Sequence, residues 1–160
     1  RYAGSKERAG KRVMIRIEEM TDDHIEAVID VLIDTFSHDP WNEKYDSAEP
    51  VRAYLINSMN NNYFLGFVLY EQGKICGICI GNKKAWIKGM EYYIDTFGIR
   101  YDWQNKGIGG LFLEEIKKRI EDYGLHGIML TTNPCFPAAS FYEKHGLVKL
   151  PELSVYATQD

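Results

Sequence analysis

The stretch QNKGIGG (residues 104–110) is the most informative part of this sequence about its fold. Residues 92–99 before it are rich in aromatic and β-branched side chains, which is typical of a β-strand. After it, apolar residues recur at helical spacing from Ile108 to Ile120, with glutamates and lysines mostly on the other face, which predicts an amphipathic helix. A glycine-rich loop therefore joins a strand to the first turn of a helix.

This arrangement is suited to binding an anion. The N–H groups of the first helical turn have no partner within the helix, glycines let a phosphate approach closely, and the helix dipole favours negative charge. Lys106 adds a positive charge beside the same position. The loop therefore predicts a phosphate site.

The spacing of the glycines distinguishes between types of phosphate loop. A Walker A loop requires Lys-Ser/Thr after its last glycine, which is absent, and a dinucleotide fingerprint requires a third glycine where Phe112 stands. The pattern Gln-x-x-Gly-x-Gly, from Gln104 to Gly109, resembles the pyrophosphate loop of the GCN5-related N-acetyltransferases, the GNAT superfamily. A glycine turn before a surface helix is the alternative interpretation of this one loop.

A second motif supports the resemblance. Asn133 follows Gln104 by 29 positions, and residues 139–147 (ASFYEKHGL) come soon after it. They resemble the family's second motif, an asparagine followed by a Phe-Tyr-Glu-Lys-x-Gly-Phe helix. The resemblance extends from Val13 to the last residue. It implies an α/β (α+β) acyl-CoA N-acyltransferase fold, with a mixed central sheet of six to seven strands, about four helices, and splayed fourth and fifth strands.

The hydrophobic periodicity along the chain agrees with that layout. Gly98 is expected to mark a bulge or a close backbone approach in the fourth strand. The expected elements are a strand at 13–18, helices at 25–36 and 50–59, a hairpin of strands at 63–70 and 74–80, a loop at 81–89, a strand at 91–99, a helix at 108–123, a strand at 127–132, a helix at 138–144 and a strand-like end at 147–156.

Length and composition are those of one globular domain. The chain has 160 residues, of which we assign 1–12 to a flexible tail and 13–160 to a single domain. A formal net charge of −4 does not favour nucleic-acid binding, and no apolar run is long enough to cross a membrane. Three cysteines and no signal peptide suit a reducing compartment, so we expect a cytoplasmic protein.

The resemblance implies acetyl-CoA as the cosubstrate. Its pyrophosphate would lie on the backbone of the glycine loop, its pantetheine arm would pair with the fourth strand, and Asn133 would bind the same arm. The residues implied in cofactor binding are Phe97, Gly98, Ile99, Gln104, Asn105, Lys106, Gly107, Ile108, Gly109, Gly110, Asn133 and Tyr142.

The implied reaction is direct attack of a neutral amine on the thioester in a ternary complex. The amine must lose a proton, and Asp95 or Glu91, on one face of the strand by alternation, is the candidate base. Asp95 is preferred, because members of the family often carry an acid at this position, and Glu91 is second. The family's acid is a tyrosine at the position of Tyr142, and a backbone N–H near Gly98 or Ile99 would stabilise the oxyanion. A salt-bridged strand carboxylate and a packed helix aromatic are the alternatives for these side chains.

The loop at residues 37–46 is either an ordinary surface loop or the rim of the acceptor site. In the second case Asp39 and Glu43 would attract a cationic amine, and Trp41 or Tyr45 would pack on it. This interpretation predicts a small primary amine of the polyamine or aminoglycoside kind. Peptide or protein N-termini and lysines are the alternative acceptors, and a non-catalytic CoA-binding regulatory module is the alternative function.

The cysteines offer weaker hypotheses. Cys76 and Cys79 are three residues apart on a strand, so they are expected to point to opposite faces, and no second Cys/His pair completes a zinc site. We therefore expect no metal. Cys135 could carry the acetyl group with His145 or His126 as base, as an alternative mechanism. The oligomeric state stays open, although a homodimer is common among relatives.

Overall fold

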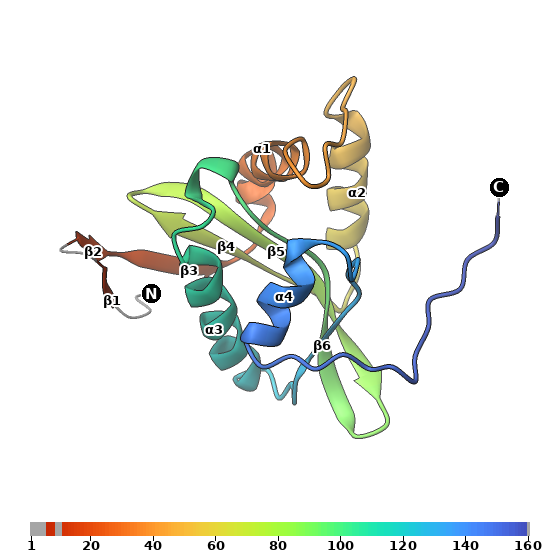
Figure 1. Cartoon of the computed structure of the whole chain (residues 1–160). Coiled ribbons are helices and arrows are strands. Elements are labelled where there is room, and N and C mark those ends of the chain that lie inside the picture. Colours follow the sequence, from red (N-terminus) through yellow and green to blue (C-terminus); the bar gives the residue numbers. More distant parts are fainter. Residues whose placement is uncertain (1–5, 9–10, 160) are drawn as a thin grey trace.

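A computed structural model describes residues 6–8 and 11–159 of the chain (Figure 1). The strands are β1 (Lys6–Arg8), β2 (Lys11–Val13), β3 (Ile15–Glu19), β4 (Phe64–Glu71), β5 (Lys74–Trp86), β6 (Gly89–Ile99) and β7 (Ile128–Leu130). The helices are α1 (Ile25–Phe36), α2 (Glu49–Met59), α3 (Ile108–Glu121) and α4 (Pro137–Lys144), with 3-10 turns at Asp22–His24 and Tyr101–Trp103.

One mixed sheet organises the structure. Its strand order is β3-β4-β5-β6-β7, in which every neighbouring pair is antiparallel except β6 and β7, which are parallel. The α3 helix provides the crossover between these two parallel strands. The predicted mixed α/β architecture is confirmed, although the sheet has five strands in place of the six to seven expected.

The two faces of the sheet carry separate apolar clusters. Helices α1 and α2 pack on one face, around Val28, Leu55 and Ile78. On the other face, α3 contributes Phe112 and Ile116 to a second cluster. Figure 1 shows α3 and α4 on one side of the sheet and α1 and α2 on the other. The sheet is thus buried on both sides, which explains why its central strands are apolar almost throughout.

Most predicted elements are confirmed within a residue or two. The first helix spans the expected residues, and Pro50 lies in the first turn of α2, where its missing N–H is harmless. Gln72 and Gly73 both have positive φ, 51° and 74°, as a two-residue turn between antiparallel strands requires.

The predicted loop at residues 81–89 is wrong. The β5 strand continues to Trp86, and it turns back into β6 through Ile87 and Lys88. The extension carries polar residues such as Asn82 and Lys84, so it has no apolar pattern that would indicate a strand. It forms because β6 offers a matching run of backbone hydrogen-bonding groups.

The two ends of the chain also differ from expectation. Residues 147–156 form no strand, and Val148, Val155 and Tyr156 are 81%, 79% and 92% exposed. Figure 1 shows this segment leading away from the helices and the sheet, where no strand is beside it to complete the pairing. At the other end, β1 and β2 pair with each other, which the composition did not predict. Residues 1–5 and 9–10, on which the rest of the tail prediction falls, lie outside the described residues.

Candidate functional site

The candidate site begins where β6 and β7 separate. Their pairing ends at Ile94 and Leu130, and the remaining residues of β6 have β5 as their only neighbour among the described strands. The register between β5 and β6 shifts by one residue at the same point, so that Asp95 is an additional residue on β6. The splay that the resemblance implied is therefore present, and its bulge lies at Asp95 and not at Gly98.

The bulge determines which backbone groups face the gap. Before it, the Tyr92 N–H donates to Gly127 O, so even-numbered residues face β7. Beyond it, the Arg100 N–H donates to Cys76 O on β5, and because antiparallel pairing alternates, Gly98 and Thr96 also face β5. The main-chain groups of Phe97 and Ile99 therefore point into the gap.

One of those groups already has partners. Gln104 Nε2 donates to Ile99 O at 2.9 Å, and Thr35 Oγ1, from α1, shares its one proton between Val31 O at 2.7 Å and Ile99 O at 3.1 Å. A Cβ on Gly98 would lie 3.1 Å from Thr35 Cγ2, so the glycine permits this close approach of helix and strand. Gln104 thus positions the loop, and Phe97 keeps both of its main-chain groups available.

A cavity of about 1050 Å³ occupies the gap. Its sides are the residues of β6 that follow Ile94 (the open half of β6), the loop before α3, the segment after β7, and α4. Of the residues implied in cofactor binding, those that line it are Phe97, Gly98, Ile99, Gln104, Asn105, Gly107, Gly109, Gly110, Asn133 and Tyr142. Lys106 and Ile108 do not line it, and the Ile108 side chain is buried in the core.

The first turn of α3 meets the requirements of an anion site. Gly107, at its N-cap, has φ of 76°, and Asn105 has φ of 59°, which turns the chain sharply into the helix. No side chain caps the helix, and no acidic residue lies in its first turn. The N–H groups at this end are therefore left to a ligand.

Two glycines in this turn have different roles. A Cβ on Gly109 would make only ordinary contacts, at 3.5 Å from Phe141 and 3.6 Å from Ile99. A Cβ on Gly110 would lie 2.6 Å from His145 Cε1, so that glycine is needed for packing against α4. His145 also contacts the Phe141 ring, and its carbonyl accepts a hydrogen bond from Lys117 Nζ. It lines the cavity, which its place in the sequence motif did not predict.

The α4 helix closes one side of the cavity with aromatic rings. Tyr142 and Phe141 pack against Phe97, with ring centroids 6.2 Å and 5.8 Å away. The Tyr142 hydroxyl forms no hydrogen bond with the described residues, and burial raises the pKa of Tyr142 above its ordinary value. Asn133 Oδ1 accepts the Cys135 N–H at 2.9 Å, which leaves the Asn133 amide NH₂ without a protein partner within the described part of the chain.

The two candidate carboxylates are placed differently. Asp95 lines the cavity, whereas Glu91 does not. Asn82 Nδ2 donates to Asp95 Oδ2 at 3.4 Å. Burial raises the pKa of Asp95, and this effect outweighs the opposing effects of Asn82 and the Lys84 charge. A carboxylate with a raised pKa is the stronger base, so the geometry favours Asp95.

Of the acceptor residues suggested in the loop at 37–46, only Trp41 lines the cavity. Its ring packs edge-on against Phe36 at the end of α1 and against Phe136 just before α4, which links the two sides. Asp39 accepts a hydrogen bond from Asn42 within the loop, and Tyr45 packs against the α1–α2 cluster. Asp39, Glu43 and Tyr45 do not line the cavity.

The cysteines are free thiols. Cys76 and Cys79 are both buried in the same apolar cluster, because a register shift at Cys76 resets the alternation on which the opposite-face prediction relied. Burial raises the pKa of each to about 12. Cys135 is exposed, and it does not line the cavity that His145 lines, so the geometry does not support the acetyl-cysteine relay.

No group of three or more His, Cys, Asp or Glu side chains that could hold a metal ion occurs among the described residues. None of their helices is both long enough and apolar enough to span a membrane.

Solved structures with the same fold include several acetyltransferases. A possible acetyltransferase from Clostridium difficile 630 is 14% identical, with a TM-score of 0.75 over 91% of this chain and 97% of that chain. An aminoglycoside acetyltransferase from an uncultured soil metagenomic sample, in complex with sisomicin, is 18% identical, with a TM-score of 0.69 over 91% of this chain and 97% of that chain. An aminoglycoside N-acetyltransferase in complex with CoA is 11% identical, with a TM-score of 0.67 over 99% of this chain and 98% of that chain.

At these identities the likeness shows the fold alone. No curated protein matches the sequence. A comparison with known protein families, however, matches residues 25–147 to the Acetyltransferase (GNAT) family. That match covers well over half of the chain and includes the glycine loop, Asn133 and Tyr142. The chain therefore belongs to the GNAT family of acetyltransferases.

Proposed function

We propose that this protein is an acetyl-CoA-dependent N-acetyltransferase that acts on a primary amine. The observation that carries the proposal is the cavity between β6 and β7, where unpaired main-chain groups of one strand lead directly to the uncapped N-terminus of α3. A long ligand that has an amide-containing arm and a diphosphate matches both parts.

The amide arm suits the open half of β6. The N–H and C=O of Phe97 and the N–H of Ile99 would bind it as an added strand is bound. The Ile99 carbonyl is already occupied by Thr35 and Gln104, so the pairing is centred on Phe97. The free amide group of Asn133 faces the same cavity and would add a hydrogen bond.

The diphosphate suits the first turn of α3. The N–H groups from Gly107 to Gly110 are available, and Gly109 leaves room for close approach. Lys106 is exposed beside the turn, and it would contribute charge from outside the cavity.

Acetyl-CoA supplies an acetyl group activated as a thioester. The amine nitrogen forms a bond to the carbonyl carbon, the carbon–sulfur bond breaks, and the sulfur leaves with the electron pair. Asp95 is the proposed acceptor of the proton that the amine loses, directly or through water, because its pKa is raised and it lines the cavity.

Tyr142 is the proposed donor to the leaving sulfur. Its raised pKa keeps the hydroxyl protonated over the physiological pH range, and no described residue competes for it. The packing of its ring on Phe97 holds it at the point where the amide arm would end.

Polyamines and aminoglycosides stay predictions for the acceptor. Trp41 at the cavity supports an acceptor site on this side, but the acidic residues Asp39 and Glu43 do not line it. Two of the structural neighbours named above are aminoglycoside acetyltransferases, at identities of 18% and 11%, too low to carry their substrate over.

The test joins calorimetry with a thiol-release assay. We expect CoA to bind the wild-type protein, and ATP and NAD to bind more weakly. Gly109→Asp should weaken CoA binding at least tenfold, since it puts a competing carboxylate at the anion site without harming the helix start. Gly127→Asp, where a Cβ would have no atom within 4 Å, is the matched control. An absence of CoA binding overturns the proposal, and binding without turnover of any amine favours the non-catalytic module.

A further inference from the structure

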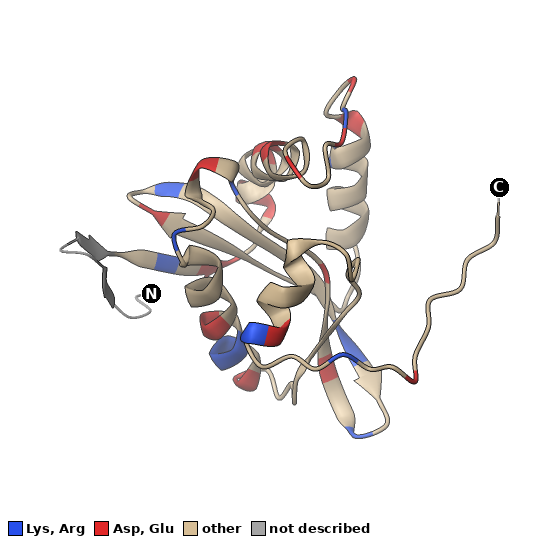
Figure 2. Ribbon diagram, in the orientation of Figure 1, with Lys and Arg blue, Asp and Glu red and all other residues tan. Residues whose placement is uncertain are grey.

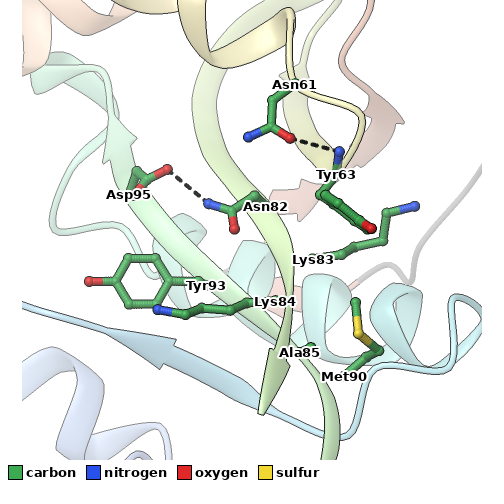
Figure 3. Close-up of a pocket in the computed structure, with 9 residues that line it drawn as sticks. All are labelled: Asn61, Tyr63, Asn82, Lys83, Lys84, Ala85, Met90, Tyr93 and Asp95. Atoms are coloured by element: carbon green, nitrogen blue, oxygen red, sulfur yellow. Dashed lines mark hydrogen bonds between the residues drawn. The ribbon is translucent and has the colours of Figure 1, made fainter.

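A second cavity, of about 600 Å³, lies next to the first (Figure 3). It is formed by the turn between α2 and β4, with Asn61 and Tyr63, and by the paired parts of β5 and β6. Asp95 lines both cavities, because its bulge lies where β6 passes from its paired half to its open half. A molecule in the second cavity therefore has direct access to the candidate base of the first.

The charge in this second cavity differs from that of the loop at 37–46. Lys83 and Lys84 line it, and Asp95 is its one carboxylate among the described residues. Neither lysine forms an ion pair within the part of the chain that the structure describes. Figure 2 shows basic positions on this end of β5 and at the turn into β6, and acidic positions on the neighbouring β6 strand. The cavity thus presents positive charge and one acid.

The charged residues of the second cavity lie toward its two ends. Asn82 donates a hydrogen bond to Asp95. Lys84 lies two residues further along β5 on the same face as Asn82, and two residues of a strand span about 7 Å. The Lys84 ammonium lies 5.1 Å from the centroid of the Tyr93 ring. In Figure 3 the Lys84 side chain extends along that ring, with Asp95 and Asn82 beyond it. The Tyr93 ring thus lies between the basic and the acidic end.

We infer that the second cavity binds the acceptor, and that the acceptor is a primary amine that also carries an anionic group several ångströms from its nitrogen. This inference rests on the proposed function. Asp95 receives the amine, Lys84 receives the carboxylate or phosphate, and Tyr93 packs on the carbon chain between them. Lys83 and Tyr63 also line the cavity, and the Lys83 charge raises the local concentration of anions.

The same placement disfavours polycations. A polyamine would place its second ammonium near Lys84, where like charges repel, whereas a carboxylate there gains a charge-assisted hydrogen bond. The inferred acceptor therefore has a negative charge at the end far from its amine, whereas the loop at 37–46 had suggested an acceptor with a positive charge there.

The experiment uses matched pairs of amines in the thiol-release assay with the full chain and acetyl-CoA. One pair is 6-aminohexanoate and hexylamine, and a second is glycylglycine and its amide. A third pair, O-phosphoethanolamine and ethanolamine, replaces the carboxylate by a phosphate. Cadaverine and spermidine represent the polycations. We expect kcat/KM to be at least tenfold higher for the anionic member of each pair and lowest for spermidine.

Lys84→Gln should reduce the preference for the anionic member at least tenfold, mainly through KM, and Lys84→Arg should retain it. Lys118→Gln, which removes an exposed charge on α3 that is paired with Glu115, is the control and should change nothing. Equal or greater turnover of polycations, or an unchanged preference in Lys84→Gln, overturns the inference but leaves the proposed function intact. CoA binding without turnover of any amine overturns both.

Discussion

The two halves of β6 contrast within a single strand. Residues 89–94 pair with β5, and from Tyr92 to Ile94 they also pair with β7, so that Tyr92 and Ile94 are buried in the core. Residues 96–99 are paired with β5 alone, and their other edge faces the larger cavity. One additional residue, Asp95, separates the halves.

This contrast shows how a strand can serve stability and binding at once. The paired half fixes the position of the strand by burial, so the open half keeps its shape without a neighbour. An unpaired edge usually invites association with other chains. Here α4 and the loop before α3 border it, so that the free groups of Phe97 and Ile99 face a cavity and not the open solvent.

The paired half should account for most of the stability. Tyr92→Ala removes a ring that is fully buried and whose hydroxyl donates to Leu65 O at 2.6 Å. We expect a loss of about 4 kcal/mol in the free energy of unfolding, measured by urea denaturation. Phe97→Ala, in the open half, should be at most half as costly because its ring is only partly buried. Equal losses would mean that the halves do not differ in this way.

The open half should account for the chemistry. Tyr142→Phe is expected to lower kcat about 100-fold, as the loss of a general acid does, with little change in stability or CoA affinity. The acid works while protonated, and its pKa is raised above the ordinary 10. The decrease in kcat should therefore be the same at every pH from 6 to 10. If turnover is unchanged across that range, Tyr142 is not the acid.

The bulge itself can be tested through Asp95. Asp95→Asn should lower kcat/KM about tenfold or more and remove the ascending limb of its pH profile. The carboxylate is the active form, its fraction increases with pH, and burial raises its pKa, so that limb lies above pH 3.8. Glu91→Gln, on the paired half and outside the cavity, should have no such effect. The reverse result would assign the base to Glu91.

The smallest expected effect concerns the contact that holds the open half against α1. Gly98→Ala would bring a Cβ to 3.1 Å from Thr35 Cγ2, and we expect a loss of about 1 kcal/mol. Thr35→Ser removes that methyl group and keeps the hydrogen bond to Ile99 O. The double variant should recover part of the loss in thermal unfolding. Additive losses would show that the two residues do not interact.

Much of this arrangement could be predicted from local patterns. The α1 helix, the Gln72-Gly73 turn and the start of α3 each depend on residues close together in the sequence. The extended end of β5 could not be predicted, because its polar residues are held by their partner strand. The strand predicted at residues 147–156 is absent for the opposite reason. These residues have high β-propensity, but no described strand lies beside them to pair with.

The site divides in the same way. The motif residues Gln104, Asn133 and Tyr142 indicated the larger cavity, and all of them line it. Thr35 and Asn82 gave no such signal, since each acts through a contact with a residue far along the chain. The acidic residues of the loop at 37–46 were favoured for their charge, but the loop satisfies Asp39 internally.

Local sequence patterns were sufficient to identify the family, the strand–loop–helix that forms the anion site, and the residue types available for acid and base chemistry. Those features depend on short spacings and on backbone geometry that glycine permits. Only the tertiary structure decided which carboxylate lies at the cavity, which backbone groups face it, and that Lys84 and Asp95 share a second cavity. Each of these depends on the single-residue register shift at Asp95, and register is set by the pairing of distant strands.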